Sequence, residues 1–289
     1  MSDLAPGTAG AVLDAVARTA PAIRAGLDER SVADEDSENP SGETQLAADV
    51  RADRLLEERL GAIDSVGTYA SEEREDAIDC GEGVSVAVDP LDGSSNLETN
   101  NPMGTIVGVF DGDLPAGGDD LLASAFVLYG PITTMTVAAD GRVDEYVIRE
   151  GADRAEIVRR DADVTLPAEP TVYGFGGRVP DWPDEFAAYV EEVERELKLR
   201  YGGAMVADVN QVLRYGGTFA YPGLTDRPEG KLRLQFEGIP MAHVIESAGG
   251  SSSDGERSLL EKVPEELHER TPVHLGNREL IERLEDALA

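Results

Sequence analysis

The stretch DPLDGSSNLETN, residues 89–100, follows directly on the apolar run VSVAV at residues 84–88. A run of this kind is typical of a strand buried on both faces. At its end, Asp89 and Asp92 stand beside a glycine and two serines. Carboxylate oxygens are the ligands that Mg²⁺ prefers, and unhindered backbone N–H groups bind anions. An Asp-Gly turn between two strands is the ordinary interpretation of DG alone, but the two acids favour a metal and phosphate site.

Two other acidic segments also follow predicted strands. Glu72 and Glu73, in TYASEERE, come after a short strand expected at residues 66–70, and Glu237 comes directly after a strand expected at residues 231–236. In a chain this acidic, a Glu-Glu pair is usually a solvated surface, and an acid at a strand end is usually exposed. Their position against apolar runs makes these residues candidates for the same site as Asp89 and Asp92.

The composition is strongly acidic. The 289 residues include 58 acids and 25 bases, which gives a net charge of −33, and the only lysines are Lys198, Lys231 and Lys262. Such a charge disfavours nucleic acid and anionic membranes as partners. Acids spread along the whole chain are suited to very high salt, where the Debye length is about 3 Å at 1 M. We therefore expect a protein of an extreme halophile.

Cysteine content and hydropathy limit the class of protein further. Cys80 is the only cysteine, so neither an intrachain disulfide nor a thiolate metal cluster is possible. No stretch reaches the roughly 18 apolar residues of a membrane helix, and residues 1–10 lack the layout of a signal peptide. We expect a soluble, cytoplasmic protein.

The apolar periodicity predicts an α/β protein with helices layered over sheets. Helices are expected at residues 11–27 and 46–60, and the polar segment 31–42 between them is expected to be a loop, either a linker or a lid. Short apolar runs at 84–88, 105–110, 121–128, 132–137 and 142–148 predict a sheet of mostly sequential strands. Further strands are expected at 171–175, 218–221, 231–236 and 273–275, and helices at 183–199, 204–213, 241–248 and 278–288.

The motifs together resemble one enzyme family. DPLDGSSN, with SEE upstream and RYGGAMVADVNQVLRYGGTFAYP and GKLRLQFEGIPMAHVIESAGG downstream, closely resembles class I fructose-1,6-bisphosphatases. These belong to the lithium-sensitive, magnesium-dependent sugar and inositol phosphatases. The resemblance extends over residues 42–284. It implies the sugar phosphatase fold, with α-β-α-β-α layers, a metal- and phosphate-binding half at 1–165 and a sugar-binding half at 166–289.

The resemblance also implies a metal centre of two or three Mg²⁺ ions around the 1-phosphate of fructose 1,6-bisphosphate. Asp49 and Glu73 would take a proton from the attacking water, and no histidine is required, because His243, His268 and His274 lie off the motif and are expected to be packing or surface residues. The ligands implied for the first two ions are Glu72, Asp89, the carbonyl of Leu91, Asp92 and Glu237. Glu43 matches a third-metal position that is usually Asp.

Substrate contacts are implied at both ends of the sugar. Gly93, Ser94 and Ser95 would bind the 1-phosphate, and Met205 would lie against the furanose ring. The 6-phosphate would be bound by Tyr201, Tyr221, Lys231 and Arg200. Because the family's arginine at the Arg200 position comes from a neighbouring subunit, the resemblance implies a homo-oligomer, typically a tetramer.

Three alternatives remain open at the sequence level. Sedoheptulose 1,7-bisphosphate differs from the fructose ester by one carbon, so the sequence hardly separates the two. Inositol monophosphatases typically have Thr at the position of Ser94 and WD before the last helix, where this chain has FEGIPMA. A non-enzymatic acidic cation-binding protein would leave Arg200, Lys231 and the glycine-serine segment unexplained.

Overall fold

The computed structural model describes residues 4–27, 34–38, 40, 44–151 and 154–289. Its largest sheet has the strand order β10-β9-β8-β7-β6-β5-β3-β4. Only the β3–β5 pair is parallel, and the other neighbours are antiparallel. The strands are β3 (Val66–Ser71), β4 (Ile78–Asp79), β5 (Val84–Asp92), β6 (Met103–Phe110), β7 (Leu121–Tyr129), β8 (Thr133–Ala139), β9 (Arg142–Arg149) and β10 (Glu156–Asp161).

Both faces of this sheet are covered by helices. α1 (Gly7–Ala25) packs on β7 and β9, and α2 (Ala47–Leu60) packs on β3 and β5. Along β5 the side chains alternate: Val86 and Val88 belong to the core under α1 and α2, whereas Ala87 belongs to the core on the opposite face. Burial on both sides explains why the strand reads as a continuous apolar run.

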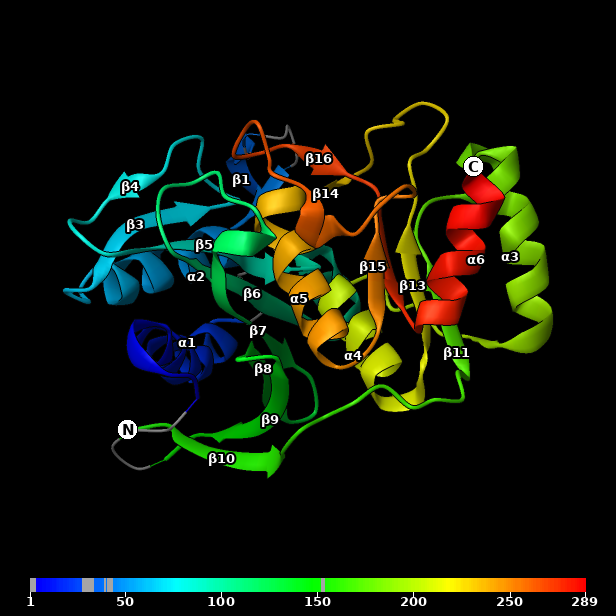
Figure 1. Cartoon of the computed structure of the whole chain (residues 1–289). Helices are drawn as coiled ribbons and strands as arrows, with labels where there is room; N and C mark the ends of the chain where they lie inside the picture. The colour runs from blue at the N-terminus through cyan, green and yellow to red at the C-terminus, as the bar shows by residue number, and fades with distance from the viewer. Residues whose placement is uncertain (1–3, 28–33, 39, 41–43, 152–153) are drawn as a thin grey trace.

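A second, five-stranded sheet follows, with the order β12-β11-β13-β17-β15. α4 (Met205–Tyr215) and α5 (Ile239–Ser247) lie between the two sheets, and α3 (Asp184–Glu196) and α6 (Arg278–Leu288) lie on the outer side (Figure 1). The predicted five-layer α-β-α-β-α fold is confirmed. The strands are β11 (Val172–Phe175), β12 (Lys198–Leu199), β13 (Gly217–Tyr221), β15 (Ser251–Ser253) and β17 (Val273–Gly276).

Three local predictions are wrong. Part of the expected loop 31–42 is a strand, β1 (Asp34–Glu38), which pairs with β2 (Thr44–Leu46). The helix expected to run to residue 199 ends at Glu196, because the chain turns to add β12 beside β11. The strand expected at 231–236 is short: only β14 (Leu232–Arg233) pairs, with β16 (Arg270–Thr271), and a π-helical turn, η5 (Leu234–Gly238), then leads into α5.

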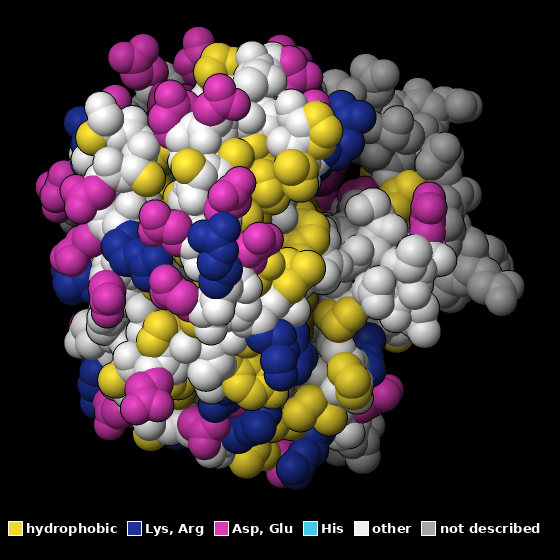
Figure 2. All heavy atoms as spheres, turned by 90° about the vertical axis from the view of Figure 1, so that its right-hand side faces the viewer, with side chains coloured by type: hydrophobic (Ala, Val, Ile, Leu, Met, Phe, Trp, Pro, Cys, Tyr) yellow, Lys and Arg dark blue, Asp and Glu magenta, His cyan; other side chains and the backbone are white. Residues whose placement is uncertain are grey.

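Acidic side chains are spread over the surface of the protein. Figure 2 views the side formed by α3 and α6, where Asp and Glu are scattered and basic side chains (Lys or Arg) lie among them. Arg283 pairs there with Glu196 at 2.9 Å and with Glu192 at 3.4 Å. Exposed pairs of this kind contribute little to stability, about 0–1 kcal/mol each. They therefore do not offset the repulsion among the many acidic side chains. In the part of the chain that the structure describes, no helix is both long and apolar enough to cross a membrane.

This charge predicts a salt requirement for folding. We expect the unfolding temperature to rise steadily as KCl is raised from about 0.2 M to about 2 M, because screening shortens the range of the self-repulsion. Circular dichroism melts at fixed pH measure the unfolding temperature. Sucrose of matched osmolality is the control, because it stabilises proteins by exclusion from their surface without screening charge. An unfolding temperature that is independent of KCl would contradict the prediction.

Candidate active site

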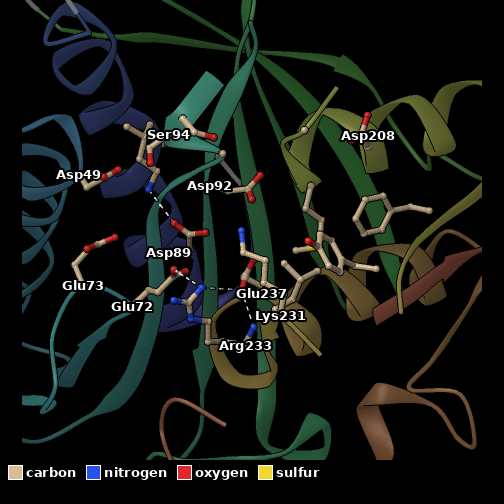
Figure 3. Close-up of a pocket in the computed structure, with 18 of the residues that line it drawn as sticks. Asp49, Glu72, Glu73, Asp89, Asp92, Ser94, Asp208, Lys231, Arg233 and Glu237 are labelled. Atoms are coloured by element: carbon tan, nitrogen blue, oxygen red, sulfur yellow. Dashed lines mark hydrogen bonds and ion pairs between the residues drawn. The ribbon is translucent and has the colours of Figure 1, made fainter. Parts of the chain in front are cut away.

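A cavity of about 460 Å³ opens where the two sheets and α2 meet. Figure 3 shows Asp49, Glu72, Glu73 and Asp89 on one side of it and Asp208 on the opposite side. Nearly every site residue predicted from the sequence lines this cavity. The lining includes Asp49, Glu72, Glu73, Asp89, Leu91, Asp92, Gly93, Ser94, Ser95, Tyr201, Met205, Tyr221, Lys231 and Glu237. Of the remaining two, Arg200 lies outside this lining, and Glu43 lies outside the described residues.

A bulge at the end of β5 brings Asp89 and Asp92 to the same cavity. Side chains alternate along a strand, so residues three apart in regular pairing would face opposite sides. Here Asp89 pairs with Ile106 and Asp92 with Gly104, which leaves one extra residue on β5. Pro90 falls within the bulge, where its missing N–H breaks no ladder hydrogen bond. Bulges of this kind are known to redirect side chains next to active sites.

Local hydrogen bonds hold the bulge in place. The N–H of Leu91 donates to Asp89 Oδ1 at 2.9 Å, and the buried Thr105 hydroxyl donates to the Pro90 carbonyl at 2.8 Å. Asp92 Oδ2 accepts from the N–H of Val206 at 2.8 Å, in the first turn of α4. Backbone N–H groups of β5 and α4 therefore hold the two carboxylates, and a hydroxyl of β6 holds the bulge between them.

Gly93 turns the chain out of β5. Its φ is +72°, in the left-handed region that favours glycine, and a Cβ there would collide with Ala204. The 3₁₀ helix η2 (Ser94–Thr99) starts immediately afterwards. Ser94 and Ser95 consequently lie in the wall of the cavity next to the carboxylates.

Glu72 reaches the cavity from the end of β3. Because β3 and β5 are parallel, with Ser71 opposite Val88, their carboxyl ends meet at one edge of the sheet. The N–H of Glu72 continues this pairing by donating to the Val88 carbonyl at 3.0 Å. Glu72 and Asp89 are consequently neighbours although they are far apart in sequence.

Asp49 belongs to the first turn of α2. Its Oδ2 accepts from the N–H of Leu46 at 2.8 Å, and the side chain is only 3% exposed. A carboxylate at this position caps the free N–H groups of a helix start. In Figure 3, Asp49 and Glu73 lie near each other at the same side of the cavity.

Glu237 is placed by the π-helical turn η5. Its Oε2 accepts from the N–H of Arg233 at 2.7 Å, four residues earlier. The Arg233 side chain is buried, with Nη1 at 2.8 Å from Glu72 Oε1 and 4.0 Å from Glu237 Oε2. Residues 234–236 therefore do not form the strand that their apolar pattern predicted, because tertiary contacts can outweigh strand propensity. π-Helical turns are common at functional sites.

The carboxylates fit a divalent cation. One ligand atom each from Glu72, Asp89 and Glu237 lies within 4.8 Å of the others, and all three residues are buried. Burial, and then the carboxylates around it, raise the pKa of Asp89 well above its ordinary value. Burial raises the pKa of Asp92 to about 7, although the Val206 N–H lowers it. Buried like charges of this kind are unfavourable unless opposite charge compensates them, and Arg233 supplies only one positive charge.

Aromatic and basic side chains also line the cavity. They include Tyr201, Phe219, Tyr221 and Lys231. Burial, and then the neighbouring Tyr221, raise the pKa of Tyr201 to about 12, so this hydroxyl stays protonated and able to donate. Arg200 is exposed, and its guanidinium carbon lies 5.7 Å from the centroid of the Tyr215 ring.

Two charged residues of the cavity were not predicted from the sequence. Arg233 was visible as an arginine within the apolar run Leu232–Phe236, and Asp208 as an acid on the apolar face of α4. Asp208 Oδ1 accepts from the N–H of Gly202 at 2.7 Å, and burial raises its pKa to about 6. Asp208 therefore holds the segment that carries Tyr201.

The fold and the acidic cavity define a metal-dependent sugar phosphatase. The family models described as the N-terminal and the C-terminal domain of fructose-1-6-bisphosphatase match residues 12–153 and 166–289. A fructose-1,6-bisphosphatase class 1 of Natronomonas pharaonis is 62% identical over 96% of this chain and 97% of the relative. That of Halobacterium salinarum strain R1 is 54% identical over 96% of both. The holo form of Leishmania major fructose-1,6-bisphosphatase superimposes with a TM-score of 0.90, at 26% identity over 96% of this chain and 93% of that one.

The chain belongs to the class I fructose-1,6-bisphosphatase family, and it is of the halophilic type.

The raised carboxyl pKa values predict a pH effect in metal-free protein. An Asp has a pKa of about 3.9 when unfolded, and that of folded Asp92 is about 7. The protonated form of Asp92 stabilises the folded protein. This stabilisation is fully present below the pKa of the unfolded state and is lost as the pH rises through the pKa of the folded state. We expect the unfolding temperature of EDTA-treated protein to fall between about pH 4 and pH 7, and excess Mg²⁺ to reduce that fall.

Asp92→Asn is the matched variant, because the amide keeps the shape of the side chain and removes its charge. Without metal, the unfolding temperature of this variant should depend less on pH than that of the wild type at the same KCl concentration. Parallel profiles for the two proteins would contradict the raised pKa of Asp92.

Proposed function

We propose that this protein hydrolyses the 1-phosphate of fructose 1,6-bisphosphate and releases fructose 6-phosphate and phosphate. The observation that carries the proposal is the single cavity that combines the buried carboxylates with Tyr201, Tyr221 and Lys231. A substrate with a phosphate at each end needs both sets of groups. The relatives named fructose-1,6-bisphosphatase class 1 support the same activity.

The proposed cofactor is Mg²⁺, with two or three ions per site. Glu72, Asp89, the Leu91 carbonyl, Asp92 and Glu237 would hold two of them, and Glu43 would hold a third. Such ions neutralise the charge of a transferring phosphoryl group and help its ester oxygen to leave. The carboxylate cluster is suited to this role, since oxygen ligands are those that Mg²⁺ prefers.

The protein's own groups would orient the phosphate and the water. Gly93, Ser94 and Ser95 offer N–H and hydroxyl donors to the 1-phosphate oxygens. Asp49 and Glu73 would accept the proton of a water that attacks the phosphorus in line with the ester bond. The Leu46 N–H fixes the Asp49 carboxylate.

At the distal end, Lys231 and the hydroxyls of Tyr201 and Tyr221 would bind the 6-phosphate, while Met205 lies against the sugar. Arg200 is exposed on its own subunit, and we propose that it completes the distal site of a neighbouring subunit in a homotetramer. Arginine suits this task because its guanidinium binds phosphate through two parallel hydrogen bonds.

The activity would place the protein in gluconeogenesis in the cytoplasm. We also propose that residues 1–165 form the metal- and phosphate-binding half and 166–289 the sugar-binding half. Both halves contribute to the cavity, since Asp89 comes from the first and Lys231 from the second.

Phosphate release from three phosphate esters tests the function. Fructose 1,6-bisphosphate, sedoheptulose 1,7-bisphosphate, inositol 1-phosphate and a phosphate-free control are compared in roughly molar KCl, with and without Mg²⁺. We expect preference for the fructose ester, full dependence on Mg²⁺ and no turnover by Asp92→Asn. Preference for the sedoheptulose ester or for inositol phosphate would identify a related phosphatase, and inactivity on every ester would favour a cation-binding protein.

Lys231→Ala tests the distal site. We expect the KM for fructose 1,6-bisphosphate to rise at least about tenfold, because a hydrogen bond to a charged group is worth about 1.5–3 kcal/mol, while kcat changes less. The KM for fructose 1-phosphate, which lacks the distal phosphate, should change little. Lys198→Ala, at a surface lysine of β12 outside the cavity, is the matched control. Equal effects of Lys231→Ala on both substrates would remove Lys231 from the distal site.

A further inference from the structure

His268 contacts the turn that carries Glu72 and Glu73. Its Nε2 lies 2.7 Å from the backbone carbonyl oxygen of Arg74. A carbonyl oxygen only accepts hydrogen bonds, so Nε2 carries the proton and donates it. The sequence separates the two residues by 194 positions, and the contact joins the C-terminal part of the chain to the acidic pair.

Other contacts hold the turn from within and from α2. The N–H of Arg74 closes it by donating to the Ser71 carbonyl at 3.1 Å. On the opposite side, the Arg74 guanidinium is tied to α2, with Nε at 2.7 Å from Asp53 Oδ2. His268 instead binds the backbone carbonyl directly after Glu73, and so attaches the turn to the C-terminal part of the chain.

The ring of His268 contacts the turn that carries Glu237. Its centroid lies 5.1 Å from that of Phe236, at an interplanar angle of 45°. Phe236 is fully buried and directly precedes Glu237 in η5. The N–H of Leu234, at the start of η5, also donates to the carbonyl of Glu269 at 2.8 Å. The segment around His268 thus contacts both the turn that carries Glu72 and Glu73 and the π-helical turn that carries Glu237.

We propose that His268 is a positioning residue, which fixes the Glu72–Glu73 turn relative to Glu237 and thereby sets the geometry of the cation site. The inference rests on the proposed function only for its effect on turnover. Imidazole suits the role because it combines an N–H donor at one edge with a flat ring for Phe236. Groups that hydrogen-bond a metal ligand directly typically contribute 10–100-fold to metal affinity or activity, and we expect the lower end of this range for His268, which acts through the backbone of the turn.

Two substitutions separate positioning from plain packing. His268→Phe keeps a flat ring against Phe236 and loses the donor. His268→Gln places an amide N–H near the position of Nε2 and loses the ring. If the residue only fills space, the Phe variant should be the better replacement. If it positions the turn, the Gln variant should be the better one.

The control is His274→Phe. His274 is another buried histidine, which bonds to the Ser253 carbonyl at 3.0 Å and lies 6.2 Å from the Phe186 ring, outside the lining of the cavity. The same His-to-Phe change there measures the general cost of losing a buried imidazole. Thermal melts of every variant show whether it folds.

The experiment measures Mn²⁺ binding by electron paramagnetic resonance of the free ion, in roughly molar KCl, together with kcat and KM. For His268→Phe we expect about tenfold weaker Mn²⁺ binding and about tenfold lower kcat with little change in KM. His268→Gln should recover most of both losses, and His274→Phe should match the wild type. Mn²⁺ binding by His268→Phe that equals the wild type, or a Gln variant weaker than the Phe variant, would overturn the inference.

The two proposals fail in different ways. Loss of Mn²⁺ affinity in His268→Phe, in a protein whose wild type releases no phosphate from fructose 1,6-bisphosphate, would uphold the role of His268 and overturn the proposed function. Normal turnover and normal Mn²⁺ binding in His268→Phe would uphold the proposed function and overturn the role of His268. If His268→Phe does not fold, His268→Leu removes the same donor and is judged by the same measurement.

Discussion

The mutual repulsion of four buried carboxylates is the interaction on which the rest of the structure depends. Glu72, Asp89, Asp92 and Glu237 are each no more than 7% exposed. Backbone N–H groups hold three of them: Leu91 donates to Asp89, Val206 to Asp92 and Arg233 to Glu237. Hydrogen bonds to the charged form lower its cost but do not remove it, so the arrangement is suited to a bound divalent cation.

The layered fold supplies these donors from separate places. β5 ends at the cavity with its bulge, α4 points its first turn at Asp92, and η5 brings Glu237 from the start of α5. α4 and α5 lie between the two sheets and belong to one core with both of them (Figure 1). Three of the carboxylates come from the ends of β3 and β5 and the fourth from η5, so the packing of α5 on the large sheet sets their relative positions.

The sequence predicted most of the site because its motifs are local. Asp89, Asp92 and Gly93 follow one apolar strand, and that context is visible without a structure. The bulge that makes Asp89 and Asp92 neighbours was not predictable, because it depends on the register between β5 and β6. Glu237 was expected after a strand, yet it lies in a π-helical turn. The ion pair of Arg233 with Glu72, beside this turn, joins segments that are distant in sequence.

Elements without a clear apolar pattern were also missed. β10, with the sequence EIVRRD, is an edge strand whose side chains are mostly exposed or half-buried, so alternation does not reveal it. His268 was expected to be a packing or surface residue, because nothing in its neighbours shows that the fold brings it to Arg74. Contacts across nearly 200 residues come from tertiary packing, and periodicity carries no information about them.

The surface charge and the chemistry of the site require the same conditions. A chain with a net charge of −33 repels an anionic sugar phosphate over long distances at low ionic strength. At about 1 M salt the Debye length is about 3 Å, so a substrate in the cavity interacts mainly with the groups that touch it. Of the three lysines, Lys262 pairs with Asp254 at 2.9 Å, Lys198 lies on an exposed edge strand, and Lys231 lines the cavity. High salt therefore serves both the folding of the acidic chain and the local recognition of phosphate by its few cations.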